Sequence, residues 1–194
     1  QLRKEAKPGQ IRTFEIRYRG VPKDGLIISK NKYGARTFFA DNWPDRAKNW
    51  IPCVDDPADK ASVEFLVTAP PHYRVVSNGA FVASSALFNK NFTHWKETAL
   101  LPTKIMVIGV AEFAVQHVGD TLGVPVSSWV YPQDKEKLFY DYALAKDILP
   151  YFINNIAPYP YGKLANVQSK TIFGGMENAG CIFYSEAIVS GKRE

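Results

Sequence analysis

The chain has 194 residues, of which 46% are hydrophobic and 22% are charged, the usage of an ordinary folded protein. This composition excludes a disordered chain, and no stretch reaches the roughly 20 apolar residues of a membrane span. The net charge is +5, with the basic excess scattered over residues 1–50, where Lys and Arg outnumber Asp and Glu by 12 to 5. Nucleic-acid-binding proteins concentrate basic charge on one face or stripe, so we expect no nucleic-acid partner.

The first two thirds of the chain show the alternation of apolar and polar residues that is typical of half-buried β-strands. Alternation or apolar runs predict strands at residues 14–19, 63–68, 92–97, 104–113 and 124–131. Of these, residues 104–113 form a fuller apolar run, which favours a strand buried on both faces. Ser77-Asn78-Gly79 is a turn signal between two short apolar segments, at residues 73–76 and 80–82, and predicts a β-hairpin.

From Asp134 onward the period becomes helical. Apolar residues recur every three or four positions and form one stripe: Leu138, Tyr142, Ala145, Leu149, Phe152 and Ile156. We expect the Asp134 carboxylate to cap the helix, and Pro150 to kink or divide it because proline lacks the amide donor. A short strand at residues 166–173 and a glycine-rich turn follow.

The change of period near residues 131–133 predicts a domain boundary and an α+β fold class. Residues 1–131 would form an all-β domain, incomplete at its N-terminal side. Residues 132–194 would begin a larger α/β domain, because about 60 residues is near the lower limit for an independent core. The chain has no initiating Met and stops just after an apparent turn, so we expect both ends to be cut.

Residues 174–180, with the sequence GGMENAG, carry the strongest chemical signal. Three glycines among seven residues let a backbone run close to another molecule, because no Cβ intervenes. Glu177 is the single charged residue there, and a lone carboxylate beside such a backbone suits a cation such as the ammonium group of a peptide N-terminus. The alternative is a solvent-facing turn with an ordinary acidic residue.

Two other segments combine turn residues with aromatic or acidic side chains. Residues 50–61, WIPCVDDPADKA, have the proline and Asp pattern of a rigid turn, with a Ca²⁺ site as the weaker alternative because EF-hand spacing is missing. Residues 158–164, PYPYGKL, either line a ligand groove or pack a helix end onto a strand. The two cysteines, Cys53 and Cys181, leave open one disulfide or two reduced thiols, and no two histidines have the i, i+4 spacing of a zinc pair.

Taken together, these three segments resemble the M1 metallopeptidases, a family of zinc aminopeptidases. Residues 174–178 match the family's G-x-M-E-N motif, residues 52–61 resemble P-C-x-D-E-P-x-x-K-A with Asp56 in place of the commoner Glu, and residues 159–164 resemble Y-P-x-x-K-L. The order and spacing of all three agree, over most of the chain from about residue 11. The resemblance implies a saddle-shaped, mainly-β N-terminal domain followed by the start of a thermolysin-like α/β catalytic domain.

The same resemblance implies a substrate site. By the motif match, Glu177 would bind the α-amino group of a peptide, and Gly174, Gly175, Met176 and Asn178 would flank the peptide as a neighbouring strand. The expected partners are therefore peptides with a free N-terminus.

The family often places a second amino anchor in a Q-x-E-P stretch, which aligns here with residues 41–44, DNWP. Trp43 stands at the Glu position and cannot bind an ammonium group by charge, although its ring face can attract a cation. Asp41, at the Gln position, is the candidate substitute. This departure leaves the preferred N-terminal residue open.

The H-E-x-x-H motif that holds the family's zinc would follow G-x-M-E-N, and the chain ends before it. The resemblance therefore implies zinc in the full-length protein, no catalytic or metal-binding residue within residues 1–194, and no activity of this chain alone. Two alternatives are a non-catalytic scaffold with the same fold and a bifunctional aminopeptidase and epoxide hydrolase. The expected protein is soluble, either cytoplasmic or, if a signal peptide has been lost, periplasmic or secreted, with its oligomeric state open.

Overall fold

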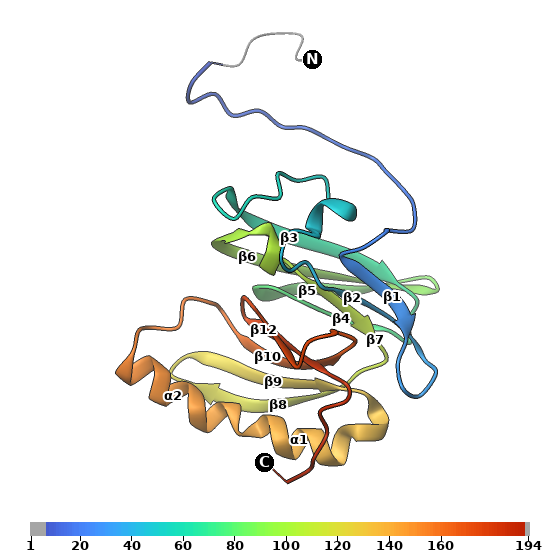
Figure 1. The fold of residues 1–194 in the computed structure, drawn as a ribbon, viewed down its shortest axis with the longest axis vertical. Helices are drawn as coiled ribbons and strands as arrows, with labels where there is room; N and C mark the ends of the chain where they lie inside the picture. Colours follow the sequence, from blue (N-terminus) through green and yellow to red (C-terminus); the bar gives the residue numbers. More distant parts are fainter. Residues whose placement is uncertain (1–6, 193–194) are drawn as a thin grey trace.

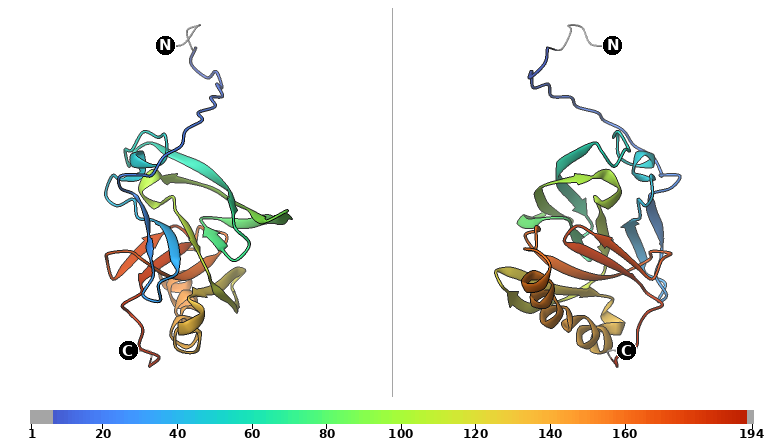
Figure 2. Two further views of the ribbon diagram at one scale, coloured as in Figure 1. Left: turned by 90° about the vertical axis from the view of Figure 1, so that its right-hand side faces the viewer. Right: turned by 60° about the vertical axis from the view of Figure 1, so that its left-hand side comes forward.

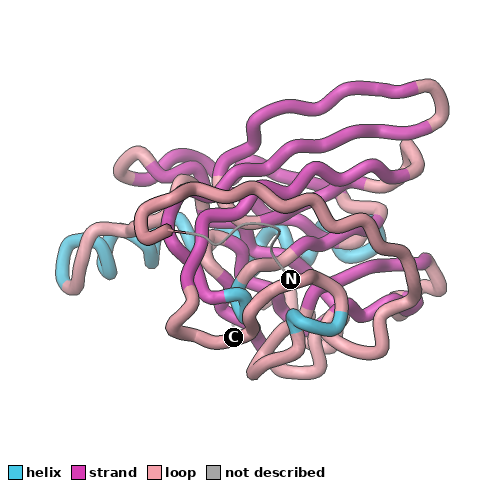
Figure 3. Tube along the Cα trace, turned by 90° about the horizontal axis from the view of Figure 1, so that it is seen from above, coloured by secondary structure: helices cyan, strands magenta, loops and turns pink. Residues whose placement is uncertain are grey.

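A computed structural model describes residues 7–192 as three β-sheets and one layer of helices (Figure 1). Figure 3, in which strands are magenta, shows how far strand prevails over helix. Within the described residues, every helix longer than three residues lies after residue 134. This arrangement confirms the α+β class, with a mainly-β part followed by the start of an α/β region.

Two of the sheets are antiparallel and are built from residues 26–111. The three-stranded sheet has the order β3-β6-β5, with β3 at Lys60–Ala69, β5 at Ala80–Leu87 and β6 at Lys90–Pro102. The four-stranded sheet has the order β1-β2-β7-β4, with β1 at Leu26–Lys30, β2 at Arg36–Ala40, β4 at Arg74–Ser77 and β7 at Ile108–Ala111. The strands predicted at residues 63–68 and 92–97 are confirmed within β3 and β6.

The third sheet is mixed and has the order β11-β12-β10-β9-β8. Its strands are β8 at Ala114–Thr121, β9 at Val124–Val130, β10 at Leu164–Ser169, β11 at Gly175–Asn178 and β12 at Cys181–Ser185. The inner strands β9, β10 and β12 run parallel, and both edge strands run antiparallel to their neighbours. The predicted strand at 124–131 is confirmed as β9, and the one at 166–173 ends early, at Ser169.

The helical segment is divided, but not at the expected residue. α1 spans Lys135–Ala143 and α2 spans Ala145–Asn155, so the division falls at Leu144 and Pro150 lies inside α2. Pro150 removes the amide that would bind the Lys146 carbonyl. That carbonyl instead accepts a hydrogen bond from Thr121 Oγ1 at 3.2 Å, which lets α2 continue.

Both helices cover the outer face of the five-stranded sheet (Figure 1). Leu138 and Leu149 of the predicted stripe are buried there, at 0% and 6% exposure. Phe152 and Ile156 are 49% and 71% exposed, so the C-terminal end of the apolar stripe is not buried. Phe152 instead lines a pocket together with residues of β10 and β12.

Asp134 occupies the residue before α1, but its carboxylate makes no capping hydrogen bond, so the predicted cap is wrong. The side chain is buried, and it accepts hydrogen bonds from Tyr33 Oη and Gln168 Nε2, both at 2.6 Å. Lys32 Nζ lies 2.8 Å from the same carboxylate. These stronger partners draw the carboxylate away from the helix N-terminus.

The strand predicted at residues 14–19 is also wrong. The segment is extended and leaves the body of the molecule (Figure 2), but it pairs with no strand of the described chain. Phe14, Ile16 and Tyr18 are all more than 60% exposed. Their alternation indicates a strand only where a neighbouring strand supplies hydrogen bonds. Here Tyr18 Oη donates to the Trp50 carbonyl at 2.8 Å, which is not a strand ladder.

The apolar run at residues 104–113 does not form a single long strand. It begins in a 3-10 helix at Thr103–Ile105 and continues as the four-residue strand β7. Asn42 Nδ2 donates to the carbonyls of Thr103 and Met106, at 3.2 and 2.7 Å, and fixes the intervening turn. β7 is largely buried between β2 and β4.

The predicted hairpin at residues 73–82 is wrong, although its turn is present. β4 pairs with β7 and β5 pairs with β6, so residues 77–79 carry the chain from one sheet to another. The buried Asn78 side chain accepts from the Val107 amide at 2.6 Å and donates to the Ile105 carbonyl at 2.9 Å. These long-range bonds direct the two strands apart.

One apolar core joins the four-stranded sheet to the inner face of the five-stranded sheet. Phe39 of β2 meets Phe183 of β12 with ring centroids 5.6 Å apart. A Cβ on Gly109 would lie 3.1–3.2 Å from side-chain atoms of Phe39, Val76 and Phe183, so the two sheets pack tightly around this glycine. The cluster extends through both sheets and includes Val107, Ala111, Phe113, Tyr131, Ala165, Val167 and Cys181.

The strand-to-helix change near residues 131–133 is not a change of sheet. β8 and β9 precede it but lie in the same sheet as β10, β11 and β12. The division into domains at residues 1–131 and 132–194 therefore stays a prediction. Among the described residues, neither α1 nor α2 has the length and apolar content that crossing a membrane requires.

Candidate functional site

Glu177 lies on β11, an edge strand of the five-stranded sheet. β11 pairs only with β12, and Glu177 faces Ile182 across this ladder. The other edge of β11 presents its backbone N–H and C=O groups to no strand of the described chain. Residues 175–178 thus form a strand, which corrects the glycine-rich turn expected there.

Alternation along β11 sends Met176 and Glu177 to opposite faces of the sheet. Met176 is partly buried and packs against the core cluster that contains Phe183. Glu177 is exposed beside a pocket that α2 helps to line. Its carboxylate makes no hydrogen bond or ion pair within the part of the chain that the structure describes.

The pocket beside Glu177 has a volume of about 400 Å³. Its walls are mainly apolar and aromatic and include Ile148 and Phe152 of α2, Tyr159 and Tyr161 of the following loop, and Ile182 and Tyr184 of β12. This volume lies within the range of about 300–1,000 Å³ that is usual for small-molecule sites. Because apolar walls lower the local dielectric, an ion pair with Glu177 would be stronger here than in bulk water.

Two polar side chains flank Glu177. Burial raises the pKa of Tyr184, and the negative charge of Glu177 raises this pKa further, so the phenol stays protonated. Its hydroxyl donates to Asn166 Oδ1 at 3.3 Å. The Asn178 side chain is buried, and its Nδ2 donates to the Met176 carbonyl at 3.3 Å, which braces β11.

The glycines of the motif differ in what the fold demands of them. Gly174 and Gly175 have no positive φ, and a Cβ there would meet its nearest neighbours at 3.6 and 3.7 Å, ordinary contact distances. Gly180 has a φ of +65°, and a Cβ would lie 2.9 Å from the Lys163 carbonyl oxygen. Within the described residues, the fold therefore requires Gly180 but neither Gly174 nor Gly175.

Residues 158–164 line a pocket and also pack against the neighbouring elements, and a ligand in that pocket stays a prediction. Tyr159 and Tyr161 line the pocket, with ring centroids 5.4 Å apart in an edge-to-face contact. Tyr159 Oη also donates to the Lys163 carbonyl at 3.2 Å, which packs the segment against the start of β10. Lys163 itself is buried.

The structure places Asp41 close to the start of the motif but leaves its carboxylate occupied. The side chain is 1% exposed, and it pairs with Arg46 Nη2 at 2.6 Å and accepts from Thr171 Oγ1 at 3.1 Å. Trp43 is 47% exposed, and its ring meets that of Phe173, the residue before Gly174, at 5.6 Å. Of the two candidates for a second amino anchor, Trp43 is the accessible one.

The acidic turn at residues 50–61 is stabilised from within the chain. Asp55 accepts from Thr103 Oγ1 at 2.6 Å and from the Lys48 amide at 3.1 Å, and Asp56 accepts from the Ala58 amide at 2.8 Å. These bonds agree with the structural-turn interpretation. Cys53 and Cys181 are free thiols, and burial raises the pKa of Cys181 to about 11.

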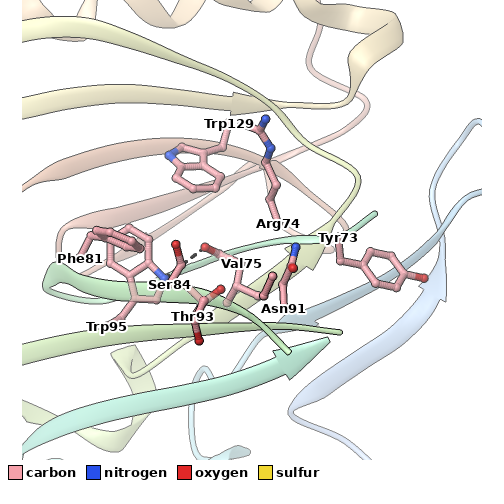
Figure 4. A pocket seen from close by; sticks show the side chains of 11 residues that line it. Tyr73, Arg74, Val75, Phe81, Ser84, Asn91, Thr93, Trp95 and Trp129 are labelled. Atoms are coloured by element: carbon pink, nitrogen blue, oxygen red, sulfur yellow. Dashed lines mark hydrogen bonds between the residues drawn. The ribbon is translucent and has the colours of Figure 1, made fainter. Parts of the chain in front are cut away.

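A second cavity, of about 500 Å³, is lined by residues of β4, β5, β6 and β9, whose side chains Figure 4 shows. Trp95 lies in its wall, and its indole Nε1 donates to the Val75 carbonyl at 3.1 Å. The rings of Phe81 and Trp129 contact the Trp95 ring edge-on, with ring centroids 5.5 and 6.2 Å from that of Trp95. None of the residues of the G-x-M-E-N motif lines this cavity.

Sequence reasoning missed the side chains that hold the loop after Glu177. Asn78 Nδ2 donates to the Ala179 carbonyl at 2.9 Å, and Lys163 Nζ donates to the Gly180 carbonyl at 3.1 Å. Asn78 lies in a recognised turn signal and Lys163 in a recognised motif. A lysine inside an aromatic and apolar segment was the available signal that this side chain is buried and bonded.

Comparison with known proteins agrees with these motifs. The model of the peptidase M1 N-terminal domain matches residues 2–105, more than half of the chain. The chain therefore belongs to the M1 peptidase family.

Curated relatives are aminopeptidases. The chain is 29% identical to aminopeptidase A of Gloydius brevicauda over 160 residues, 81% of this chain and 16% of that protein. It is 27% identical to glutamyl aminopeptidase of Homo sapiens over 150 residues, 75% of this chain and 16% of that protein. It is 28% identical to aminopeptidase N of Canis lupus familiaris over 149 residues, 73% of this chain and 15% of that protein. The chain thus spans about a sixth of the length of the curated relatives it matches.

Proposed function

We propose that the full-length protein is a zinc-dependent aminopeptidase that releases N-terminal residues from peptides. In this proposal Glu177 binds the substrate's α-amino group, and Gly174, Gly175, Met176 and Asn178 flank the peptide. The observation that carries the proposal is the unpaired Glu177 carboxylate on a free strand edge, beside a pocket of about 400 Å³.

The free edge of β11 supports the binding of an extended peptide. Peptides commonly bind by adding a strand to an exposed sheet edge, where main-chain hydrogen bonds supply affinity. Gly174 and Gly175 suit such an approach, because neither glycine is required by the described fold and neither carries a Cβ.

The position of a single carboxylate supports exopeptidase rather than endopeptidase activity. A carboxylate that pairs with the terminal ammonium group fixes one end of the peptide, so cleavage is counted from the N-terminus. Loss of one partner from a desolvated charge pair costs about 2–5 kcal/mol. Peptides with a blocked N-terminus would therefore bind much more weakly.

The side chains in the described part of the chain do not form a site that suits a zinc ion. The described residues contain no group of three or more His, Cys, Asp or Glu side chains placed to bind a metal ion. The sequence also contains no H-E-x-x-H motif. We propose that the family's zinc is bound elsewhere in the full-length protein, and that residues 1–194 alone are inactive.

The substitution Glu177→Gln in the full-length protein tests this function. It keeps the shape of the side chain but removes the charge that would pair with the substrate ammonium group. We expect kcat/KM for an aminoacyl anilide to fall by at least about 30-fold, with zinc content unchanged. Steady-state kinetics and metal analysis measure the two quantities.

Glu112→Gln is the matched control. Glu112 is exposed in the loop between β7 and β8 and lines neither cavity described above, so this variant should keep the original kcat/KM. Unchanged hydrolysis by the Glu177→Gln variant would contradict the proposed role. A full-length protein that binds no zinc and hydrolyses no aminoacyl substrate would favour the scaffold alternative.

A further inference from the structure

The loop that follows Glu177 is held from outside its own hairpin. Ala179 and Gly180 form the two-residue connection between β11 and β12, which Asn178 and Cys181 close as the last pair. The carbonyls of both loop residues accept hydrogen bonds from buried side chains, one from Asn78 and one from Lys163. The two donors come from separate parts of the chain.

Asn78 is fixed in one orientation by three hydrogen bonds. It is 1% exposed; its Oδ1 accepts from the Val107 amide, and its Nδ2 donates to the carbonyls of Ile105 and Ala179. The Val107 bond determines which end of the amide is oxygen, so both Nδ2 hydrogens point at carbonyls. An aspartate at this position would face those carbonyls with no proton to donate.

Lys163 ties the same loop to the end of β4. Its Nζ donates to the Ser77 carbonyl at 2.6 Å and to the Gly180 carbonyl at 3.1 Å, and it lies 5.0 Å from the centre of the Trp95 ring. The side chain is 7% exposed. Burying an ammonium group costs free energy unless the group is hydrogen-bonded, so Lys163 depends on its bonds to the Ser77 and Gly180 carbonyls.

The need for such ties follows from the position of β11. An edge strand has a ladder on one side only, so the closing loop has a large part in fixing its place. Glu177 lies two residues before Ala179. A displacement of about 1 Å at a reacting group can cost about 100-fold in rate.

We propose that Asn78 and Lys163 are positioning residues, which hold the β11–β12 loop so that the Glu177 carboxylate meets the substrate ammonium group. The turn at residues 77–79 thereby takes part in substrate recognition, although it contacts no substrate. This inference rests on the proposed function of Glu177.

A double-mutant cycle in the full-length protein tests the inference. Asn78→Asp and Lys163→Met are each made alone and together with Glu177→Gln, and kcat and KM are measured with an aminoacyl anilide. We expect each substitution alone to lower kcat/KM at least tenfold, mainly through a higher KM. In the Glu177→Gln background, each should lower kcat/KM less than twofold, because the anchor is already lost.

Asn42→Asp is the matched control. Asn42 is fully buried, donates to the carbonyls of Thr103 and Met106, and accepts from Trp50 Nε1, so none of these hydrogen bonds goes to the β11–β12 loop. Its effect on kcat/KM should be the same in both backgrounds. Lys163→Met replaces the lysine with an uncharged side chain of similar length. If Asn78→Asp does not fold, the result for Lys163→Met decides alone.

The outcomes separate this inference from the function on which it rests. If Asn78→Asp and Lys163→Met lower kcat/KM equally in both backgrounds, the two residues are only structural and the inference is overturned. If Glu177→Gln alone leaves kcat/KM unchanged, the proposed function fails. A thermal unfolding scan of each variant shows that the assays compare folded proteins.

Discussion

Gly180, in the two-residue loop after the strand that carries Glu177, has a backbone conformation that residues with a side chain rarely adopt. Its φ is +65°, and a Cβ would lie 2.9 Å from the Lys163 carbonyl oxygen. Both the conformation and the contact oppose any larger residue. We expect Gly180→Ala to lower the free energy of unfolding by more than about 1 kcal/mol, as measured by urea denaturation.

Gly123 separates the two causes. It has a similar φ of +82° in the turn between β8 and β9, but a Cβ there would meet no atom within 4 Å. Gly123→Ala therefore carries only the conformational cost, and it should destabilise the protein less than Gly180→Ala does. Equal losses for the two variants would show that the contact with the Lys163 carbonyl contributes nothing.

At the scale of single residues, the sequence indicates chemistry better than it indicates contacts. Glu177 is recognisable because it is the one charge in a glycine-rich segment, and the structure places it on an open edge. Asp41 shows the limit: its alignment suggests an amino anchor, but Arg46 and Thr171 occupy its carboxylate. No local pattern predicts that pairing, since Thr171 lies 130 residues further along the chain.

At the scale of elements, α2 depends on a strand to compensate for its internal proline. The Lys146 carbonyl has no amide partner at Pro150 and accepts from Thr121 Oγ1 of β8 instead. Thr121→Val removes this donor while keeping the shape of the side chain. We expect a loss of about 0.5–1.5 kcal/mol in the free energy of unfolding, measured by urea denaturation.

Pro150→Ala provides the internal check. Alanine restores an amide that can donate to the Lys146 carbonyl, so Thr121→Val should cost less in this background than in the original protein. The same cost in both backgrounds would show that the Thr121 hydroxyl does not replace the missing helix bond.

The elements also show why sequence patterns identify strands more readily than partners. β3, β6 and β9 are found from alternation and apolar runs, because one face or both are buried. The segment at residues 14–19 has the same alternation and no ladder in the described chain. The expected hairpin at residues 73–82 fails because Asn78 binds residues some thirty positions away, and β1 and β2 lack a clear alternation.

At the scale of the whole molecule, a buried carboxylate links the two sheets that share the central core. Asp134 accepts from Tyr33 in the turn between β1 and β2 and from Gln168 in β10, and it pairs with Lys32. The four-stranded and five-stranded sheets are therefore joined by polar bonds as well as by Phe39 and Phe183. The sequence suggested a helix cap at this position because capping is local, whereas these partners lie 34 and 101 residues away.

The pH dependence of stability should reveal this link. Burial alone would raise the pKa of Asp134, but hydrogen bonds from Gln168, Lys32 and Tyr33 outweigh burial and hold it below its ordinary value. A lowered pKa in the folded state stabilises the protein above the unfolded value of about 3.9, and this contribution is lost as the pH falls through the folded pKa. We expect Asp134→Asn to lower the free energy of unfolding by about 1–3 kcal/mol at pH 7. The difference from the original protein should shrink as the pH falls below about 4, as measured by urea denaturation at a series of pH values. Asp45→Asn is the control: it removes an exposed ion pair with Lys48 and should change the free energy of unfolding at pH 7 far less. If the plots of this free energy against pH for Asp134→Asn and the original protein stay parallel down to about pH 3, the role of Asp134 is contradicted.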